Sequence, residues 1–85
     1  HLFTNVLHAS QMTFIAGEAP AQSFECTAKV RYRQPDQRCR VEMQGDNATV
    51  TFENPQRAVT PGQSVVLYQG EECLGGGIIE TSEMA

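Results

Sequence analysis

Hydrophobic and polar residues alternate along several short segments of the chain. The segment Ala48–Glu53 alternates over its whole length, and Lys29–Arg33 alternates charged residues with apolar or aromatic ones. An alternation of period two is typical of a strand with one buried face, and no window shows the spacing of an amphipathic helix. The pattern predicts strands near Leu2–Leu7, Met12–Ala16, Glu25–Arg33, Arg38–Met43, Ala48–Glu53, Ser64–Tyr68 and Cys73–Glu80.

Turn-forming residues separate the predicted strands. They lie at Gln34–Gln37, Gln44–Asn47, Pro61–Gln63 and Gln69–Glu72. Strands at this spacing, without helices, predict an all-β domain: a small antiparallel β-barrel of about six to seven strands. We expect Gly17–Ser23 to form a loop and Thr81–Ala85 a frayed tail. Because more strand sequence follows Gly75–Gly77, we expect a glycine bulge at a barrel corner there, not a phosphate-binding loop before a helix.

The size of the chain limits what it can do alone. Its 85 residues, of which 40% are hydrophobic, predict one domain over 1–85 and exclude a two-domain enzyme with a cleft between lobes. No apolar run is long enough to span a membrane. The chain starts without an initiator Met or a leader sequence, so we expect a fragment of a longer, soluble protein.

Cysteine, histidine and serine residues form no recognisable metal or catalytic motif. Cys26, Cys39 and Cys73 are separated by 13 and 34 residues, which matches no paired-cysteine metal motif and would leave one thiol over if two paired. We expect buried, reduced thiols. His1 and His8 have no partner at ligand spacing, so we expect no metal site. No serine lies in a nucleophile elbow and no carboxylate pair is placed for acid–base chemistry, so we predict no catalytic residue.

Charge is divided unevenly along the chain. The sequence carries a formal net charge of −4, which by itself argues against a nucleic-acid partner. Between Lys29 and Arg40, however, five basic residues stand against Asp36 alone, a local net charge of +4. A basic stripe with acidic surroundings can still hold a phosphate backbone in one place.

A hairpin would place these cations on one face. If residues 34–37 form a four-residue loop, three cross-strand pairs result: Arg33 with Arg38, Arg31 with Arg40, and Lys29 with Glu42. Four arginines would then face outward, while the alternate positions face the core: Val30, Tyr32, Cys39 and Val41. Such a face suits phosphate, because a planar guanidinium can bind two oxygens at once. The alternative is that acidic residues of this chain, or of a neighbouring domain, neutralise the stripe.

Three motifs together resemble a known family. KVRYRQ at 29–34, PQRAVTPGQS at 55–64 and CLGGGII at 73–79 are similar to motifs in the C-terminal domain of the tRNA-specific 2-thiouridylases, the MnmA/TrmU family. The resemblance implies a β-barrel at the end of a cytoplasmic enzyme. That enzyme would use ATP with Mg to activate the wobble uridine of tRNA, and would insert sulfur supplied as a persulfide by a sulfur-relay protein. The resemblance also implies that the ATP site and the catalytic cysteines lie in an upstream catalytic domain, so no cofactor belongs to this fragment.

The same resemblance implies which residues contact tRNA near its anticodon. The Arg-Tyr pair of RYRQ corresponds to Arg31 and Tyr32, and the Gln after Pro-Gly corresponds to Gln63. The resemblance and the charge pattern together predict this RNA-binding set: Arg31, Tyr32, Gln63, Arg33, Arg38 and Arg40. Alternation turns Tyr32 inward, so its ring can stack on a base only if the end of the strand exposes it. Two alternatives stay open: a structural cap that stabilises the catalytic domain with little RNA contact, and a β-barrel binding module like those of translation factors.

Overall fold

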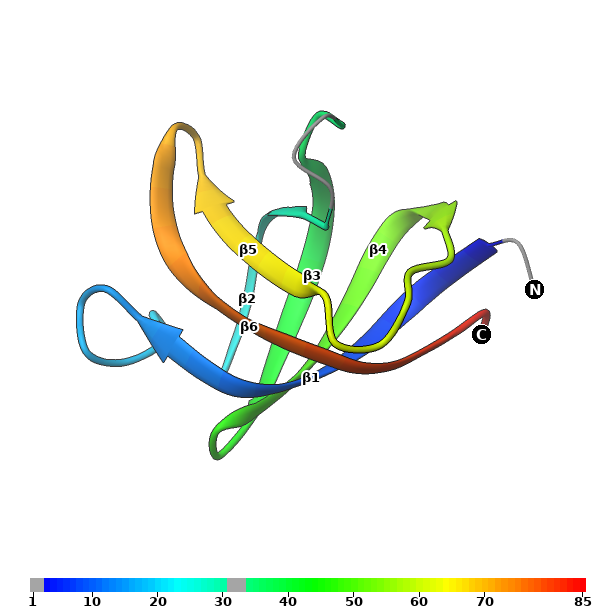
Figure 1. Cartoon of the computed structure of the whole chain (residues 1–85). Helices are drawn as coiled ribbons and strands as arrows, with labels where there is room; N and C mark the ends of the chain where they lie inside the picture. The colour runs from blue at the N-terminus through cyan, green and yellow to red at the C-terminus, as the bar shows by residue number, and fades with distance from the viewer. Residues whose placement is uncertain (1–2, 31–33) are drawn as a thin grey trace.

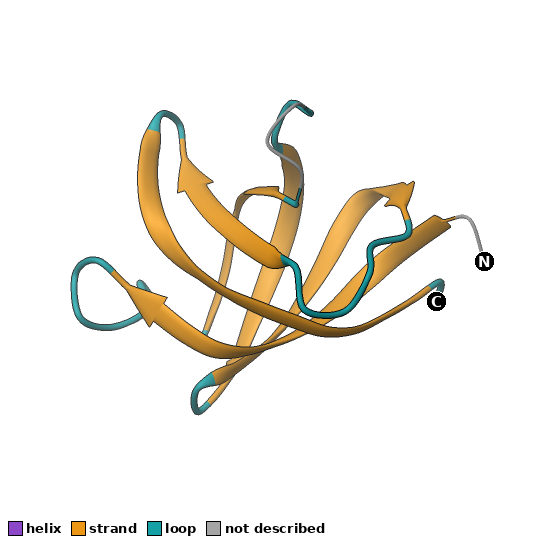
Figure 2. Cartoon of the chain, viewed as in Figure 1, coloured by secondary structure: helices purple, strands orange, loops and turns teal. Residues whose placement is uncertain are grey.

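The computed structural model describes residues 3–30 and 34–85, and its regular secondary structure is entirely β-strand (Figures 1 and 2). The strands are β1 (Phe3–Phe14), β2 (Ser23–Lys29), β3 (Gln37–Gln44), β4 (Asn47–Arg57), β5 (Ser64–Gln69) and β6 (Glu72–Glu83). They pair antiparallel in the order β1-β4-β3-β2-β5-β6, and the pairing of β6 with β1 closes the barrel. The predicted small antiparallel barrel is confirmed, with six strands.

The inward faces of the strands build one core. Six of its side chains have no exposed surface: Leu7, Val41, Val50, Val65, Leu67 and Ile79. The alternation predicted for β4 is observed, because Ala48, Val50 and Phe52 are buried while the residues between them are more exposed. This burial of apolar surface is the main source of the barrel's stability.

Two predicted strands are one in the structure. Leu2–Leu7 and Met12–Ala16 were expected to be separate, but β1 is a single strand of 12 residues. Between the pairs Ser10–Ile78 and Thr13–Gly76 the register with β6 shifts, and Gln11 there has a φ of 53°. This bulge bends β1 around the barrel without ending it.

The end of the chain is also more ordered than predicted. The frayed tail expected at Thr81–Ala85 is wrong, because Thr81, Ser82 and Glu83 belong to β6 and pair with β1. The backbone N–H of Ala85 donates a hydrogen bond to Asn5 Oδ1 at 2.8 Å. The last strand is long because β6 must pair with β1 as well as with β5 to close the barrel.

Two of the predicted turns are tight hairpins. Gly45 and Asp46 connect β3 to β4, and Gly70 and Glu71 connect β5 to β6. Both glycines have a φ near 60°, which a two-residue hairpin turn requires and glycine adopts without strain. The turns predicted at Gln44–Asn47 and Gln69–Glu72 are therefore confirmed.

The glycine run lies inside β6, where neighbouring strands approach closely. The predicted bulge is confirmed: Leu74 is the extra residue between the pairs Leu67–Gly75 and Tyr68–Cys73. A Cβ atom on Gly76 would lie 2.3 Å from the carbonyl oxygen of Val65 in β5. A side chain at Gly75 would meet the backbone of β1 instead. The glycines therefore let β6 fit between β1 and β5.

Candidate nucleic-acid interface

The structure describes half of the predicted RNA-binding residues. Arg38 and Arg40 lie on β3, and Gln63 lies directly before β5. Arg31, Tyr32 and Arg33 lie outside the described residues, so their predicted roles stay predictions. The described part of the candidate interface comprises the outer faces of β2, β3 and β4 together with Gln63.

The pairing of β2 with β3 differs from the predicted hairpin. The observed outward pairs are Thr27 with Arg38, Glu25 with Arg40, and Ser23 with Glu42. Each partner on β2 is six residues earlier in the sequence than predicted, because β2 ends at Lys29 and residues 30–36 connect it to β3. The predicted opposition of arginine with arginine across this hairpin is therefore wrong.

Side-chain contacts of β2 account for the longer connection. The Thr27 hydroxyl donates a hydrogen bond to the Asp36 carboxylate, so that Asp36 contacts β2 instead of closing a turn over residues 34–37. This hydrogen bond lowers the pKa of the Asp36 carboxyl below its usual value. Lys29 pairs with Val66 of β5, and its Nζ lies 5.9 Å from the centroid of the Tyr68 ring, within cation–π range.

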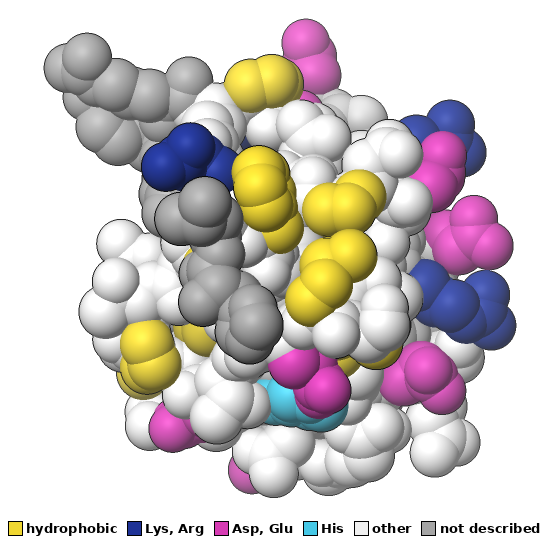
Figure 3. Space-filling model, turned by 90° about the vertical axis from the view of Figure 1, so that its right-hand side faces the viewer, with side chains coloured by type: hydrophobic (Ala, Val, Ile, Leu, Met, Phe, Trp, Pro, Cys, Tyr) yellow, Lys and Arg dark blue, Asp and Glu magenta, His cyan; other side chains and the backbone are white. Residues whose placement is uncertain are grey.

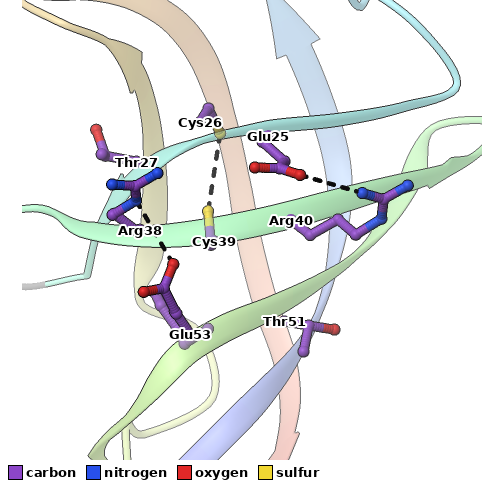
Figure 4. Close-up of a pocket in the computed structure, with 9 residues that line it drawn as sticks. Glu25, Cys26, Thr27, Arg38, Cys39, Arg40, Thr51 and Glu53 are labelled. Carbon is purple, nitrogen blue, oxygen red and sulfur yellow. Dashed lines mark hydrogen bonds and ion pairs between the residues drawn. The ribbon is translucent and has the colours of Figure 1, made fainter.

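Both arginines of β3 have an acidic neighbour. Arg38 Nε lies 3.5 Å from Glu53 Oε2, and Arg40 Nη1 lies 3.5 Å from Glu25 Oε2 (Figure 4). Figure 3 shows basic and acidic side chains next to one another along one edge of the molecule. All four side chains are more than half exposed, and ion pairs of this kind contribute about 0–1 kcal/mol. A phosphate could therefore compete with either carboxylate at little cost.

These side chains border an open groove of about 500 Å³ between β2, β3 and β4 (Figure 4). Hydroxyl groups of Thr27 and Thr51 line it beside the two ion pairs, and Cys26 and Cys39 meet in its wall. Its two arginines and two glutamates cancel in formal charge. The groove thus offers hydrogen-bond donors and acceptors but no net positive charge.

Gln63 occupies a rigid position on the rim of the barrel. Its carbonyl oxygen accepts a hydrogen bond from the Ile79 N–H at 2.8 Å, and the Gly62 N–H donates to the Ile79 carbonyl at 2.8 Å. Its side chain is exposed and makes no hydrogen bond to any described residue, so the amide can both donate and accept. Since Lys29 pairs with Val66, Gln63 lies about 10 Å along β5 from the end of β2. Gln63 and the last residue of β2 therefore lie near the same end of the β2–β5 strand pair.

Sequence reasoning left open that acidic residues of this chain neutralise the stripe, but it did not identify Glu53 and Glu25 as the partners. Glu53 comes from β4, and Glu25 faces Arg40 only in the observed register. The alternation of Glu25, Thr27 and Lys29 along one face of β2 was a usable signal for an outward polar face. No local signal indicated which residues of β3 these three residues of β2 would oppose.

Comparisons with known proteins agree with the fold and with the motifs. The family model described as "Aminomethyltransferase beta-barrel domain" matches residues 4–79. The chain is 58% identical over 79 residues to the tRNA-specific 2-thiouridylase MnmA of Francisella philomiragia, a match that covers 92% of the chain and 22% of that protein. It is likewise 58% identical over 79 residues to the MnmA of Marinobacter nauticus, covering 93% of the chain and 20% of that protein.

The chain therefore spans about a fifth of the length of the curated relatives it matches. The matched part is the C-terminal region of these relatives. Within the residues that the structure describes, no helix has the length and apolar character of a membrane-spanning segment.

Proposed function

This chain belongs to the aminomethyltransferase beta-barrel domain family, as the C-terminal region of a tRNA-specific 2-thiouridylase, and from this membership we propose that it positions tRNA for an upstream catalytic domain. In the parent protein, that upstream domain would bind ATP with Mg, take persulfide sulfur from a relay protein and make 2-thiouridine at the wobble position, in the cytoplasm. The observation that carries the proposal is Gln63, whose backbone is held by a hydrogen bond from Ile79 while its side-chain amide is exposed. An amide of this kind can recognise a base edge or a ribose hydroxyl.

The proposed contacts fall into two groups. Arg31, Tyr32 and Arg33, together with Gln63, would bind the tRNA most directly. Arg38 and Arg40 would add less, because an acidic neighbour offsets the attraction of each for phosphate. This ranking predicts that Gln63 and the segment 31–33 contribute more to tRNA binding than the two arginines of β3 do.

Replacing Gln63 tests the rim contact. In the full-length parent, Gln63→Ala should weaken tRNA binding about fivefold, because one hydrogen-bonding amide contributes about 1 kcal/mol. The slope of log affinity against log salt should not change, because a neutral amide releases no counterion. Gln22→Ala is the matched control, because this exposed glutamine precedes the opposite end of β2. Equal affinities for wild type and Gln63→Ala across the salt titration would remove Gln63 from the interface.

Removing an acidic partner tests whether Arg38 faces the tRNA. Glu53→Gln should strengthen tRNA binding by the parent about threefold, because it frees the Arg38 guanidinium for phosphate. Glu18→Gln removes the same charge from the loop between β1 and β2, where no ion pair is present among the described residues. It should change affinity less. If both variants bind tRNA equally well, Arg38 does not meet the RNA.

The ion pairs also favour a second candidate function. A stripe that this chain neutralises itself needs no external anion, so the barrel could act as a structural cap that stabilises the catalytic domain. In that case the variants above would change the thermal stability of the parent and leave its tRNA affinity unaltered.

A further inference from the structure

Two cysteine side chains meet between β2 and β3. Cys26 and Cys39 are directly paired across the strands, and their sulfur atoms lie 3.7 Å apart (Figure 4). A disulfide requires sulfurs about 2.05 Å apart on residues whose Cα atoms are roughly 4.4–6.8 Å apart. Directly opposed residues of antiparallel strands have Cα separations within that range. Side-chain rotation at these two positions can therefore bring the sulfurs to bonding distance.

The two thiols differ in access and in acidity. Cys39 is buried in the core, whereas Cys26 is only partly buried, and both contribute to the wall of the open groove. The hydrogen bond between the two thiols lowers the pKa of Cys26 from its ordinary value, and burial of Cys26 opposes that shift. The same hydrogen bond, together with burial, raises the pKa of Cys39. Cys26 is therefore the thiol that forms a thiolate and meets a solute first.

We propose that Cys26 and Cys39 are a redox-sensitive pair that forms a reversible intramolecular disulfide with a two-electron oxidant such as hydrogen peroxide. The Cys26 thiolate attacks one peroxide oxygen, and the O–O bond breaks to leave Cys26 sulfenic acid and hydroxide. The Cys39 sulfur then attacks the Cys26 sulfur. The S–S bond forms, the S–O bond breaks, and the hydroxyl leaves with the Cys39 proton as water. The pair loses two electrons, and a dithiol returns them by exchange.

The bond would fix β2 to β3 beside the two ion pairs of the groove. It would close the loop of residues 27–38 and so restrict the unfolded chain. For a domain of this size we expect the melting temperature to rise by about 5–15 °C on oxidation. The effect does not depend on tRNA binding, so the proposal stands apart from the proposed function.

Peptide mapping of the 85-residue chain tests the linkage. The chain is oxidised with hydrogen peroxide, its remaining thiols are alkylated, and it is digested with trypsin without reduction. If the disulfide forms, the digest should contain one linked peptide pair, in which residues 1–29 are joined to the dipeptide Cys39-Arg40. Dithiothreitol should separate the two peptides and reverse the rise in melting temperature.

Single serine variants supply the controls. Cys73→Ser should keep the linked species, because Cys73 lies on β6 and pairs with Tyr68. Cys26→Ser and Cys39→Ser should each lose the linked species and the temperature shift. The proposal is overturned if peroxide takes Cys26 to sulfinic acid without forming the link, if Cys73 is the linked partner, or if both thiols stay fully alkylatable while Cys73 is oxidised.

Discussion

Gly76→Ala is expected to destabilise the barrel by about 3 kcal/mol or more. The new Cβ would lie 2.3 Å from the Val65 carbonyl oxygen, a backbone atom that no side-chain rotation can move away. Gly76 is paired on both sides, with Val66 of β5 and Thr13 of β1, so β6 can shift only by disturbing two ladders. A domain of this size has a total stability of about 5–15 kcal/mol, so the loss is a large fraction of it. Urea unfolding followed by far-ultraviolet circular dichroism measures the change.

Gly45→Asn is the matched control for this variant. Gly45 lies in an exposed turn, a Cβ atom there meets nothing within 4 Å, and asparagine tolerates its φ of 63° better than other residues do. Because a side chain is strained at this φ, we expect the change to cost about 1–2 kcal/mol, less than Gly76→Ala. If Gly76→Ala unfolds at the same urea concentration as the control, β6 is not held as tightly between its neighbours as the backbone distances indicate.

Replacing both Arg31 and Arg33 by glutamine should weaken tRNA binding by the full-length parent about 100-fold. Each charge-assisted contact to phosphate contributes about 1.5 kcal/mol, or roughly tenfold in affinity. The log–log salt slope should fall in magnitude by about 1.4–1.8, because two cations no longer release counterions. Affinity measured at several salt concentrations gives both quantities.

The control for this pair removes one cation together with its acidic partner. Arg38→Gln combined with Glu53→Gln leaves the net charge unchanged and dissolves one exposed ion pair, so we expect tRNA affinity to stay within about threefold. Suppose instead that the Arg31 and Arg33 variant keeps wild-type affinity and salt slope while the parent melts at a lower temperature. The cationic stripe would then be a clamp between domains, and the structural cap would replace the RNA-positioning role.

The sequence allowed accurate predictions wherever short-range chemistry determines the structure. Gly45 and Gly70 marked their turns because a two-residue hairpin requires their backbone angles. The alternation of Ala48–Glu53 identified a half-buried strand, because one face of β4 packs against the core. The bulge at the glycine run was predictable because residues without a side chain tolerate close approach of another backbone.

Predictions that depended on distant partners were less successful. The turn residues at 34–37 suggested a short hairpin, but the register is set by contacts such as Thr27 with Asp36 and Lys29 with Val66. Since a strand register decides which charges face each other, this error also hid Glu25 as the partner of Arg40. The partner of Arg38, Glu53, comes from β4 and does not depend on that register. Gln63 was identified through its motif. The hydrogen bond that fixes its backbone comes from Ile79 of β6, a partner distant in sequence.

The pairing of the first strand with the last also constrains how this domain folds during its synthesis. Val6 pairs with Glu83, so a contact that closes the barrel spans nearly the whole chain, and the end of β6 lies close to the start of β1 (Figure 1). Contacts so distant in sequence form slowly, because much of the chain must lose conformational entropy before these contacts can form and stabilise it. During synthesis the sheet stays open until β6 leaves the ribosome. Until then β1 and β5 present unpaired backbone edges, which are the surfaces on the nascent chain most exposed to misassociation.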